Sequence, residues 1–165
     1  MVRARDQEFA DFFSARFDAT RRVAYAMCGS WVDAEEITQN AFVRVYARWA
    51  KIRLDTVDAY LRTVVTRVFL DTKRRARARE QAFADVPDQA VPPDHSSHDR
   101  LAMQAALMTV PPGQRAVLVL RYVADLSIDQ VAEILGCSAG TVKSQAARGL
   151  ATLRANLDPA TTGNR

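Results

Sequence analysis

The stretch from Leu126 to Leu150 has the layout of a helix-turn-helix, and it constrains the fold of this chain more than any other feature. Ser127 can cap a first short helix, because a serine hydroxyl accepts a hydrogen bond from a free backbone N–H of the first turn. Gly136 then supplies a tight turn, and Ser138 can cap a second helix. Apolar residues recur at helical spacing in both, namely Ile128, Val131, Ala132 and Leu135, then Val142, Ala146, Gly149, Leu150 and Leu153. Each of these apolar faces must be buried.

The second helix carries small, hydroxylated and cationic residues opposite its apolar face when it advances by about 100° per residue. These residues are Gly140, Ser144, Ala147 and Arg148, with Thr141 and Lys143 on the flanks. A helix that enters the major groove of DNA needs a close approach, phosphate donors near its start and one or two long side chains that reach base edges. The segment therefore predicts a recognition helix for promoter or operator DNA. The alternative is an ordinary helical hairpin in a small bundle.

The chain has 165 residues, a net charge of +4 and a sequence pI near 9.4. Basicity of this size supports nucleic-acid binding only beside a motif, because solvated basic faces are common in soluble proteins. Residues 77–100 hold 5 acidic against 3 basic side chains, 3 prolines and little apolar periodicity. This composition predicts a flexible acidic linker between two small helical domains.

Three helices are predicted before this linker. The first has an apolar face formed by Phe9, Phe12, Phe13 and Phe17. It stops at Gly29, and Asp33 with Glu36 three residues later indicates a capping-box-like start for the second. The apolar face of the second helix consists of Ile37, Ala41, Val45 and Trp49. A third helix is expected from residues 56–58 onward, and no strand signal appears, so the predicted fold class is all-α.

Cys28 and Cys137 are the only cysteines, and no CxxC pair or apolar leader segment is present. No apolar run approaches the roughly 20 residues that a bilayer span needs. We therefore expect a reduced, cytoplasmic protein without membrane insertion. Cys137 is expected to pack in the turn, although the sequence leaves a redox role for either cysteine open.

Four segments, in this order along the chain, together resemble one known family. The segments are residues 33–49, 59–75, 110–122 and 140–144. They are similar to the extracytoplasmic-function sigma factors of bacterial RNA polymerase, and the similarity covers roughly residues 8 to 157. One such motif would be weak, but four in order with an acidic linker between them make chance similarity unconvincing.

The resemblance implies sigma region 2 in residues 8–78, a linker in residues 79–100 and sigma region 4 in residues 101–157. In this family region 2 binds core polymerase and opens the promoter at the minus-ten element. Region 4 binds the polymerase flap and recognises the minus-thirty-five element. Core polymerase and promoter DNA are then the expected partners and an anti-sigma factor is a further candidate, while the free chain is expected to be a monomer.

Residue roles follow from the resemblance position by position. The polymerase-binding set is Asp33, Glu35, Glu36, Gln39, Asn40 and Phe42. The minus-ten set is Lys51, Arg53, Tyr60, Arg62, Thr63, Thr66, Arg67, Lys73, Arg74 and Arg75. The minus-thirty-five set is Thr141, Lys143, Ser144, Gln145 and Arg148. The loop of residues 50–56 matches the segment that receives a flipped-out base in this family, which needs stacking surface and hydrogen-bond partners.

Some positions keep two interpretations. Phe42 either contacts polymerase or packs in the core, and Arg121 is either solvated or bound to a phosphate. Tyr122 is expected to pack in the scaffold. Many relatives carry Asn where Arg67 stands and Arg where Gln145 stands, which puts the minus-ten preference and one phosphate contact in doubt.

The linker aspartates Asp85, Asp88, Asp94 and Asp99 are compatible with the family's acidic path toward the polymerase active site. His95 and His98 lie there too, but no further ligand completes a metal set, so neither metal nor cofactor is expected. An enzyme is rejected because no phosphate loop, serine elbow or metal motif is present. An operator-binding regulator is the remaining alternative, and it would need a sensing or dimerising domain where residues 33–75 stand.

Overall fold

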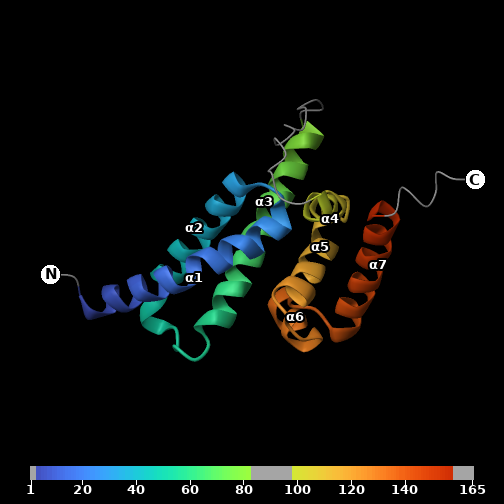
Figure 1. The fold of residues 1–165 in the computed structure, drawn as a ribbon. Helices are drawn as coiled ribbons and strands as arrows, with labels where there is room; N and C mark the ends of the chain where they lie inside the picture. The colour runs from blue at the N-terminus through green and yellow to red at the C-terminus, as the bar shows by residue number, and fades with distance from the viewer. Residues whose placement is uncertain (1–2, 83–97, 158–165) are drawn as a thin grey trace, which may run out of the picture. The chain divides into compact units, whose positions relative to one another are not determined.

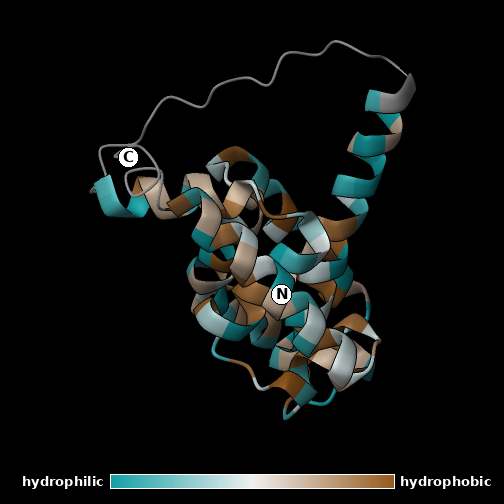
Figure 2. Ribbon diagram, turned by 90° about the vertical axis from the view of Figure 1, so that its right-hand side faces the viewer, coloured by the Kyte–Doolittle hydropathy of each residue, from teal (hydrophilic) through white to brown (hydrophobic). Residues whose placement is uncertain are grey.

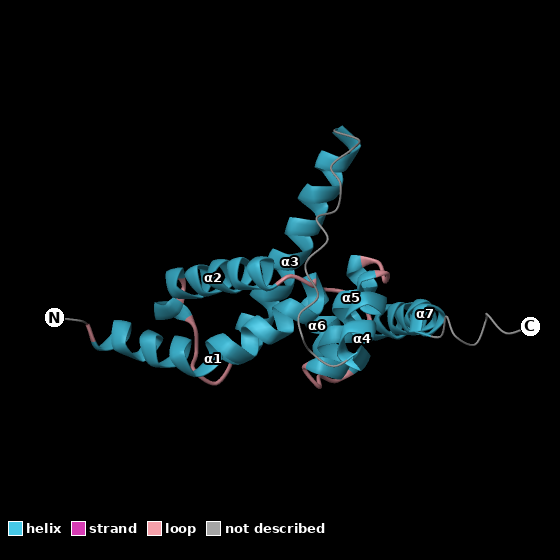
Figure 3. Ribbon diagram, turned by 45° about the horizontal axis from the view of Figure 1, so that its top comes forward, coloured by secondary structure: helices cyan, strands magenta, loops and turns pink. Residues whose placement is uncertain are grey.

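The computed structural model describes residues 3–82 and 98–157, and within these ranges it contains only helices and the turns that join them (Figure 3). The expected all-α fold is thereby confirmed. The helices are α1 (Ala4–Cys28), α2 (Trp31–Ala47), the short η1 (Trp49–Lys51), α3 (Val57–Ala82), α4 (His98–Met108), α5 (Pro112–Leu118), the π-helical turn η2 (Val119–Val123), α6 (Ile128–Leu135) and α7 (Ala139–Leu157) (Figure 1).

The chain divides into two compact units, Met1–Phe69 and Leu70–Arg165, which are described separately below. Helix α3 crosses this division and continues to Ala82, past the end predicted for the first domain at residue 78. Its last turns are mostly hydrophilic (Figure 2).

Asp85, Asp88, Asp94 and His95 lie outside the described residues, whereas Asp99 is an exposed residue in the first turn of α4. No helix in the described ranges combines the length and hydropathy that a bilayer span requires.

Aromatic rings pack α1 along α2 in the first unit. The ring of Phe42 is 2% exposed, and its centroid lies 4.9 to 6.3 Å from those of Phe9, Phe12, Phe13 and Phe17. Rings at these separations gain edge-to-face contacts in addition to the burial of their apolar area. The phenylalanine face predicted for α1 therefore finds its partner on α2.

The junction between α1 and α2 differs from the prediction, because the capping residue of α2 lies three residues earlier than expected. Gly29 ends α1 in the left-handed region with φ 76°, as expected, and its N–H donates to the carbonyl of Tyr25. Helix α2 then begins at Trp31, because the Ser30 hydroxyl accepts from the N–H of Asp33 at 3.3 Å. Ser30, not Asp33, is the cap. Asp33 lies instead in the first turn, where a carboxylate is favoured by the helix dipole.

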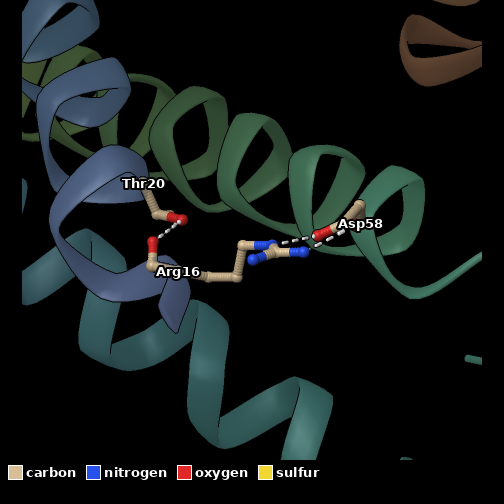
Figure 4. A network of polar contacts seen from close by, with 3 residues as sticks. All are labelled: Arg16, Thr20 and Asp58. Atoms are coloured by element: carbon tan, nitrogen blue, oxygen red, sulfur yellow. Dashed lines mark hydrogen bonds and ion pairs between the residues drawn. The ribbon is translucent and has the colours of Figure 1, made fainter. Parts of the chain in front are cut away.

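An ion pair connects α1 to the first turn of α3 (Figure 4). The Arg16 guanidinium donates to both carboxylate oxygens of Asp58, at 2.7 and 3.4 Å, and the hydrogen bond to Asp58 raises the pKa of Arg16 above its ordinary value. The Thr20 hydroxyl donates to the Arg16 carbonyl at 2.7 Å. Both charged side chains are close to half exposed, so the pair contributes at most about 1 kcal/mol of stability. Its main effect is to hold the first turn of α3 against α1.

A buried arginine joins α4 to α5 in the second unit. Arg115 is 5% exposed, and its guanidinium donates to the carbonyls of Leu107, Met108 and Val110 at 2.9 to 3.3 Å. Leu107 and Met108 end α4, where helix carbonyls attract a cation, and Val110 follows two residues after the helix. Arg115 therefore supplies hydrogen bonds that the end of α4 needs.

Helices α5 and α7 approach each other closely at Gly149. A Cβ atom on this buried glycine would lie 3.0 and 3.1 Å from Cδ1 and Cγ of Leu118, which is itself 3% exposed. By contrast, a Cβ on Gly140 would meet only the Ser138 hydroxyl oxygen, at 3.8 Å. Of the two glycines of α7, only Gly149 is therefore required to be small by packing.

We expect Gly149→Val to lower the free energy of unfolding of the second unit by about 1–3 kcal/mol or more, because its methyl groups overpack the core against Leu118. Gly140→Ala is the matched control, and we expect it to be neutral or to stabilise by up to about 1 kcal/mol through helix propensity. Urea unfolding followed by circular dichroism measures both. Equal effects of the two changes would contradict the close approach of α5 and α7.

Candidate nucleic-acid and polymerase interfaces

The predicted helix-turn-helix forms α6 and α7. Ser127 caps α6 in a full capping box, since its hydroxyl accepts from the Gln130 N–H at 3.1 Å and the Gln130 side chain accepts from the Ser127 N–H at 2.8 Å. Gly136 ends α6 with φ 65°. The Ser138 hydroxyl then accepts from the Thr141 N–H at 3.1 Å and starts α7. All three terminus predictions are confirmed.

The outward face of α7 is exposed as the helical spacing predicted. Val142 and Gly149 are buried, whereas every residue predicted for the outward face and its flanks is exposed, namely Gly140, Thr141, Lys143, Ser144, Ala147 and Arg148. Gln145 is half-buried. Within the described ranges neither Lys143 nor Arg148 forms an ion pair, so both cations are available to an anionic partner.

The turn before this motif departs from the prediction. Residues 119–123 form a π-helical turn, and Asp125 follows with φ 56°, a conformation that most non-glycine residues avoid. Tyr122 is 60% exposed, so the expectation that it packs in the scaffold is wrong. Arg121 donates to the Leu126 carbonyl at 2.6 Å, which secures the entry to α6.

Helix α2 separates the predicted polymerase-binding residues onto different faces. Phe42 is in the aromatic core, so it does not contribute to an exposed surface, and this correction resolves its two interpretations. The other members of the set, Asp33, Glu35, Glu36, Gln39 and Asn40, are exposed. At about 100° per residue, Glu35 lies on the same side as Phe42, and Asp33 and Asn40 lie on the other shoulder beside Arg44.

Glu36 and Gln39 share the outer face of α2 with two valines that the sequence analysis did not single out. Val32 and Val43 are 77% and 67% exposed, and all four residues fall within about 60° around the helix axis. Their signal was present in the sequence, since neither valine belongs to the Ile37, Ala41 and Val45 stripe. A mixed apolar and acidic face of this kind suits a protein partner.

The loop between α2 and α3 is anchored at both ends. Trp49 is 6% exposed and packs edge-to-face on the ring of Phe9 and at a tilt against that of Phe12, at 5.3 and 5.2 Å between centroids. Val57 is 4% exposed at the other end. Between these anchors, Lys51 and Arg53 are exposed and Leu54 is 67% exposed. Arg53 also donates to Asp55 at 3.1 Å. The loop therefore presents an apolar side chain and two cations from a fixed base.

Helix α3 brings together only part of the predicted minus-ten set. At about 100° per residue, Tyr60, Thr63, Arg67 and Arg74 fall within about 60° of one another. Arg62, Lys73 and Arg75 lie about 90° or more from the centre of this stripe. Thr66 is fully buried and its hydroxyl donates to the Arg62 carbonyl at 2.8 Å, so a direct DNA contact from Thr66 is wrong.

One further hydrogen bond connects the exposed surfaces of α1 and α2. The Tyr46 hydroxyl donates to the Asp6 carboxylate at 2.8 Å, and this bond raises the pKa of Tyr46 above its ordinary value.

In the part of the chain that the structure describes, no cluster of three or more His, Cys, Asp or Glu side chains could hold a metal ion. His98, one of the two linker histidines, is the first residue of α4.

Comparisons with known proteins match both units. The family model described as Sigma-70 region 2 matches residues 13–79, and that described as Sigma-70, region 4 matches residues 100–153. An RNA polymerase sigma-E factor of Streptomyces avermitilis is 37% identical over 153 residues, which are 92% of this chain and 86% of that protein. ECF RNA polymerase sigma factor SigE of Mycolicibacterium smegmatis is 37% identical over 145 residues, 83% of this chain and 56% of that protein.

The chain belongs to the extracytoplasmic-function sigma factors. As such, it is a transcription initiation factor that directs promoter recognition by RNA polymerase. Among solved structures, the sigma factor RpoE of Bartonella quintana, in complex with the anti-sigma factor NepR, aligns with a TM-score of 0.77 over 93% of this chain and 98% of that one. Because the two sequences are only 22% identical, that likeness is evidence for the fold of this sigma factor and for nothing further.

Proposed function

We propose a division of labour in which the exposed face of α7 recognises the minus-thirty-five element, the loop of residues 50–56 and the α3 stripe engage the minus-ten element, and the outer face of α2 binds core polymerase. The sigma factor has no catalytic chemistry of its own in this proposal, and it acts in the cytoplasm with the polymerase. An anti-sigma factor is a further proposed partner, because the solved structure of RpoE is that of its complex with the anti-sigma factor NepR.

The outward face of α7 is the observation that carries the proposal. Lys143 and Arg148 are exposed, without ion pairs in the described ranges, and they lie on a helix whose opposite side is buried through Val142. Ser144, one turn before Arg148, donates its hydroxyl to the Gly140 carbonyl and keeps lone pairs for an incoming donor. Small residues between these side chains allow the backbone to approach DNA closely.

The first unit favours a sigma factor over an operator-binding regulator. Its exposed surface offers the outer face of α2, which we propose for core polymerase, and the part of the α3 stripe that carries Tyr60, Thr63 and Arg67. No sensing pocket with convergent polar groups is needed to account for these residues.

The purified chain should therefore bind duplex promoter DNA weakly and become specific only with core polymerase, because each unit offers few phosphate contacts. Gel shifts with and without core test this, and tight specific binding by the chain alone would favour the regulator.

We expect Glu36→Lys to weaken binding to core polymerase, because it reverses the only charge on the outer face of α2 that is flanked by Val32, Gln39 and Val43. Glu8→Lys is the matched control, since Glu8 is an exposed carboxylate on α1, away from this face. Pull-down of core with each variant measures the effect, and circular dichroism checks the helical content. If both variants capture core as well as the parent does, the face is merely solvated and its assignment fails.

Arg148 and Lys143 should act differently at the minus-thirty-five element. If Arg148 contacts a base edge, Arg148→Ala should cost about 1–3 kcal/mol and relax the preference at one or two base pairs. Lys143 is nearer the helix start, so Lys143→Ala should weaken binding to all promoters similarly and lower the salt slope by about one unit. Transcription from a template already melted at minus ten should survive both changes. Its loss, with core binding intact, would refute the division of labour.

A further inference from the structure

The loop of residues 50–56 has a turn of its own and two fixed ends. The N–H and the hydroxyl of Thr56 both donate to the Arg53 carbonyl at 3.1 Å, and the Arg53 side chain pairs with Asp55 at 3.1 Å. These bonds shape the turn that carries the exposed Leu54. They are all local, so they do not determine where the turn lies relative to the helices on either side. That position depends on the two ends of the loop.

One face of α1 holds both ends. Phe12 and Arg16 lie four residues apart, so they are neighbours on that face. The ring of Phe12 lies 5.2 Å from that of Trp49, where the loop begins. The Arg16 guanidinium pairs at 2.7 Å with Asp58, just past the end of the loop (Figure 4), and its carbon lies 5.9 Å from the centroid of the Phe12 ring. A continuous line of contacts thus crosses the base of the loop, and we call it the α1 brace: Trp49, Phe12, Arg16 and Asp58.

The ion pair adds a direction that apolar burial at the end of the loop does not supply. The hydrophobic effect is non-directional, so it keeps Val57, 4% exposed, in the core but tolerates rotation of α3 about its axis. A guanidinium that bonds both oxygens of one carboxylate has a preferred geometry, and Arg16 reaches the two oxygens of Asp58 at 2.7 and 3.4 Å. The contact with the Phe12 ring in turn restricts the Arg16 side chain. The brace therefore fixes the angle at which α3 leaves the loop.

We propose that Phe12 and Arg16 of α1 are positioning residues for promoter opening, and that they hold the loop of residues 50–56 in the shape that discriminates between bases. The proposal rests on the minus-ten role of this loop proposed above, and it adds α1, which no motif had assigned to that step. Neither residue contacts DNA itself, because Arg16 acts through Asp58 and Phe12 acts through Arg16 and Trp49. A pocket for an extruded base selects by its shape and hydrogen bonds, so a loop whose ends move still binds but selects less well.

The first test follows the loop in the free chain. Hydrogen exchange measured by mass spectrometry should be about fivefold faster in residues 50–58 of the Arg16→Ala chain, which is the factor that an exposed ion pair at its upper strength can supply. The amides in the middle of α2 should keep the exchange rates of the parent, because the change is local. Arg22→Ala is the matched control, since Arg22 is an exposed arginine on another face of α1. Equal loop exchange in Arg16→Ala and the parent would show that the pair does not hold the loop.

The second test measures base selection by the holoenzyme. Templates already melted across the minus-ten region carry each of the four bases in turn at each melted position of the non-template strand, and the lifetimes of their complexes are compared. We expect the ratio between the best and the worst base to fall by about fivefold for Arg16→Ala, at the position where it also falls for Lys51→Ala with Leu54→Ala. Asp58→Ala should act like Arg16→Ala, and the two changes together should lose no more than either alone, because all three variants lack the same ion pair. Phe12→Leu, which keeps an apolar side chain but removes the ring beside Arg16, should show a smaller loss in the same direction.

Three outcomes would overturn the proposal. One is unchanged base selection in the Arg16→Ala holoenzyme when the Lys51 and Leu54 double variant loses it, which would leave the role of the loop intact without the brace. A second is additive losses in Arg16→Ala and Asp58→Ala, which would mean that the two side chains act separately. A third is an equal loss in Arg22→Ala, which would indicate a general effect of charge. If the Lys51 and Leu54 double variant keeps full selection, the minus-ten role of the loop fails first, and the brace falls with it.

Discussion

The burial of Phe42 among the phenylalanines of α1 is the constraint on which the geometry of the first unit depends. It determines which side of α2 faces α1, and therefore which residues remain for partners. The same cluster includes Trp49, so it also fixes the start of the loop that runs to α3. With the far end of that loop held by Val57 and by the ion pair between Arg16 and Asp58, an irregular segment is presented from a rigid base.

In the second unit, a close helix contact and a buried arginine determine how α7 is held. This unit is small, and its helices can share a core only if they approach closely, which Gly149 permits against Leu118. Arg115 is a charge that would be costly to bury alone, but the carbonyls at the end of α4 compensate it. The result is a scaffold in which α7 is held along one side only. Its other side, with Lys143 and Arg148, stays open to solvent.

Each unit thus combines a buried core with small exposed surfaces to which we have assigned proposed roles. A recognition helix with two cations, or a loop with one apolar tip, offers only a small number of contacts to DNA. In the proposed division of labour, promoter specificity is a sum over both units, and core polymerase holds both on the same DNA. On this proposal, a short chain with a net charge of only +4 acts on promoters without binding DNA strongly by itself.

Local rules determined the helices, the ends at Gly29 and Gly136, the cap at Ser127 and the outward face of α7, because these depend on residues within a few positions of one another. The sequence also determined the family, through motifs distributed along the chain. Only the tertiary structure decided that Phe42 and Thr66 are buried, that Tyr122 is exposed and that Arg115 serves the end of α4. It alone brought Arg16 beside Asp58 and Phe12 beside Trp49. Helical periodicity predicts which residues share a face. Which helix covers that face depends on packing between segments far apart in the chain, and local rules do not contain that information.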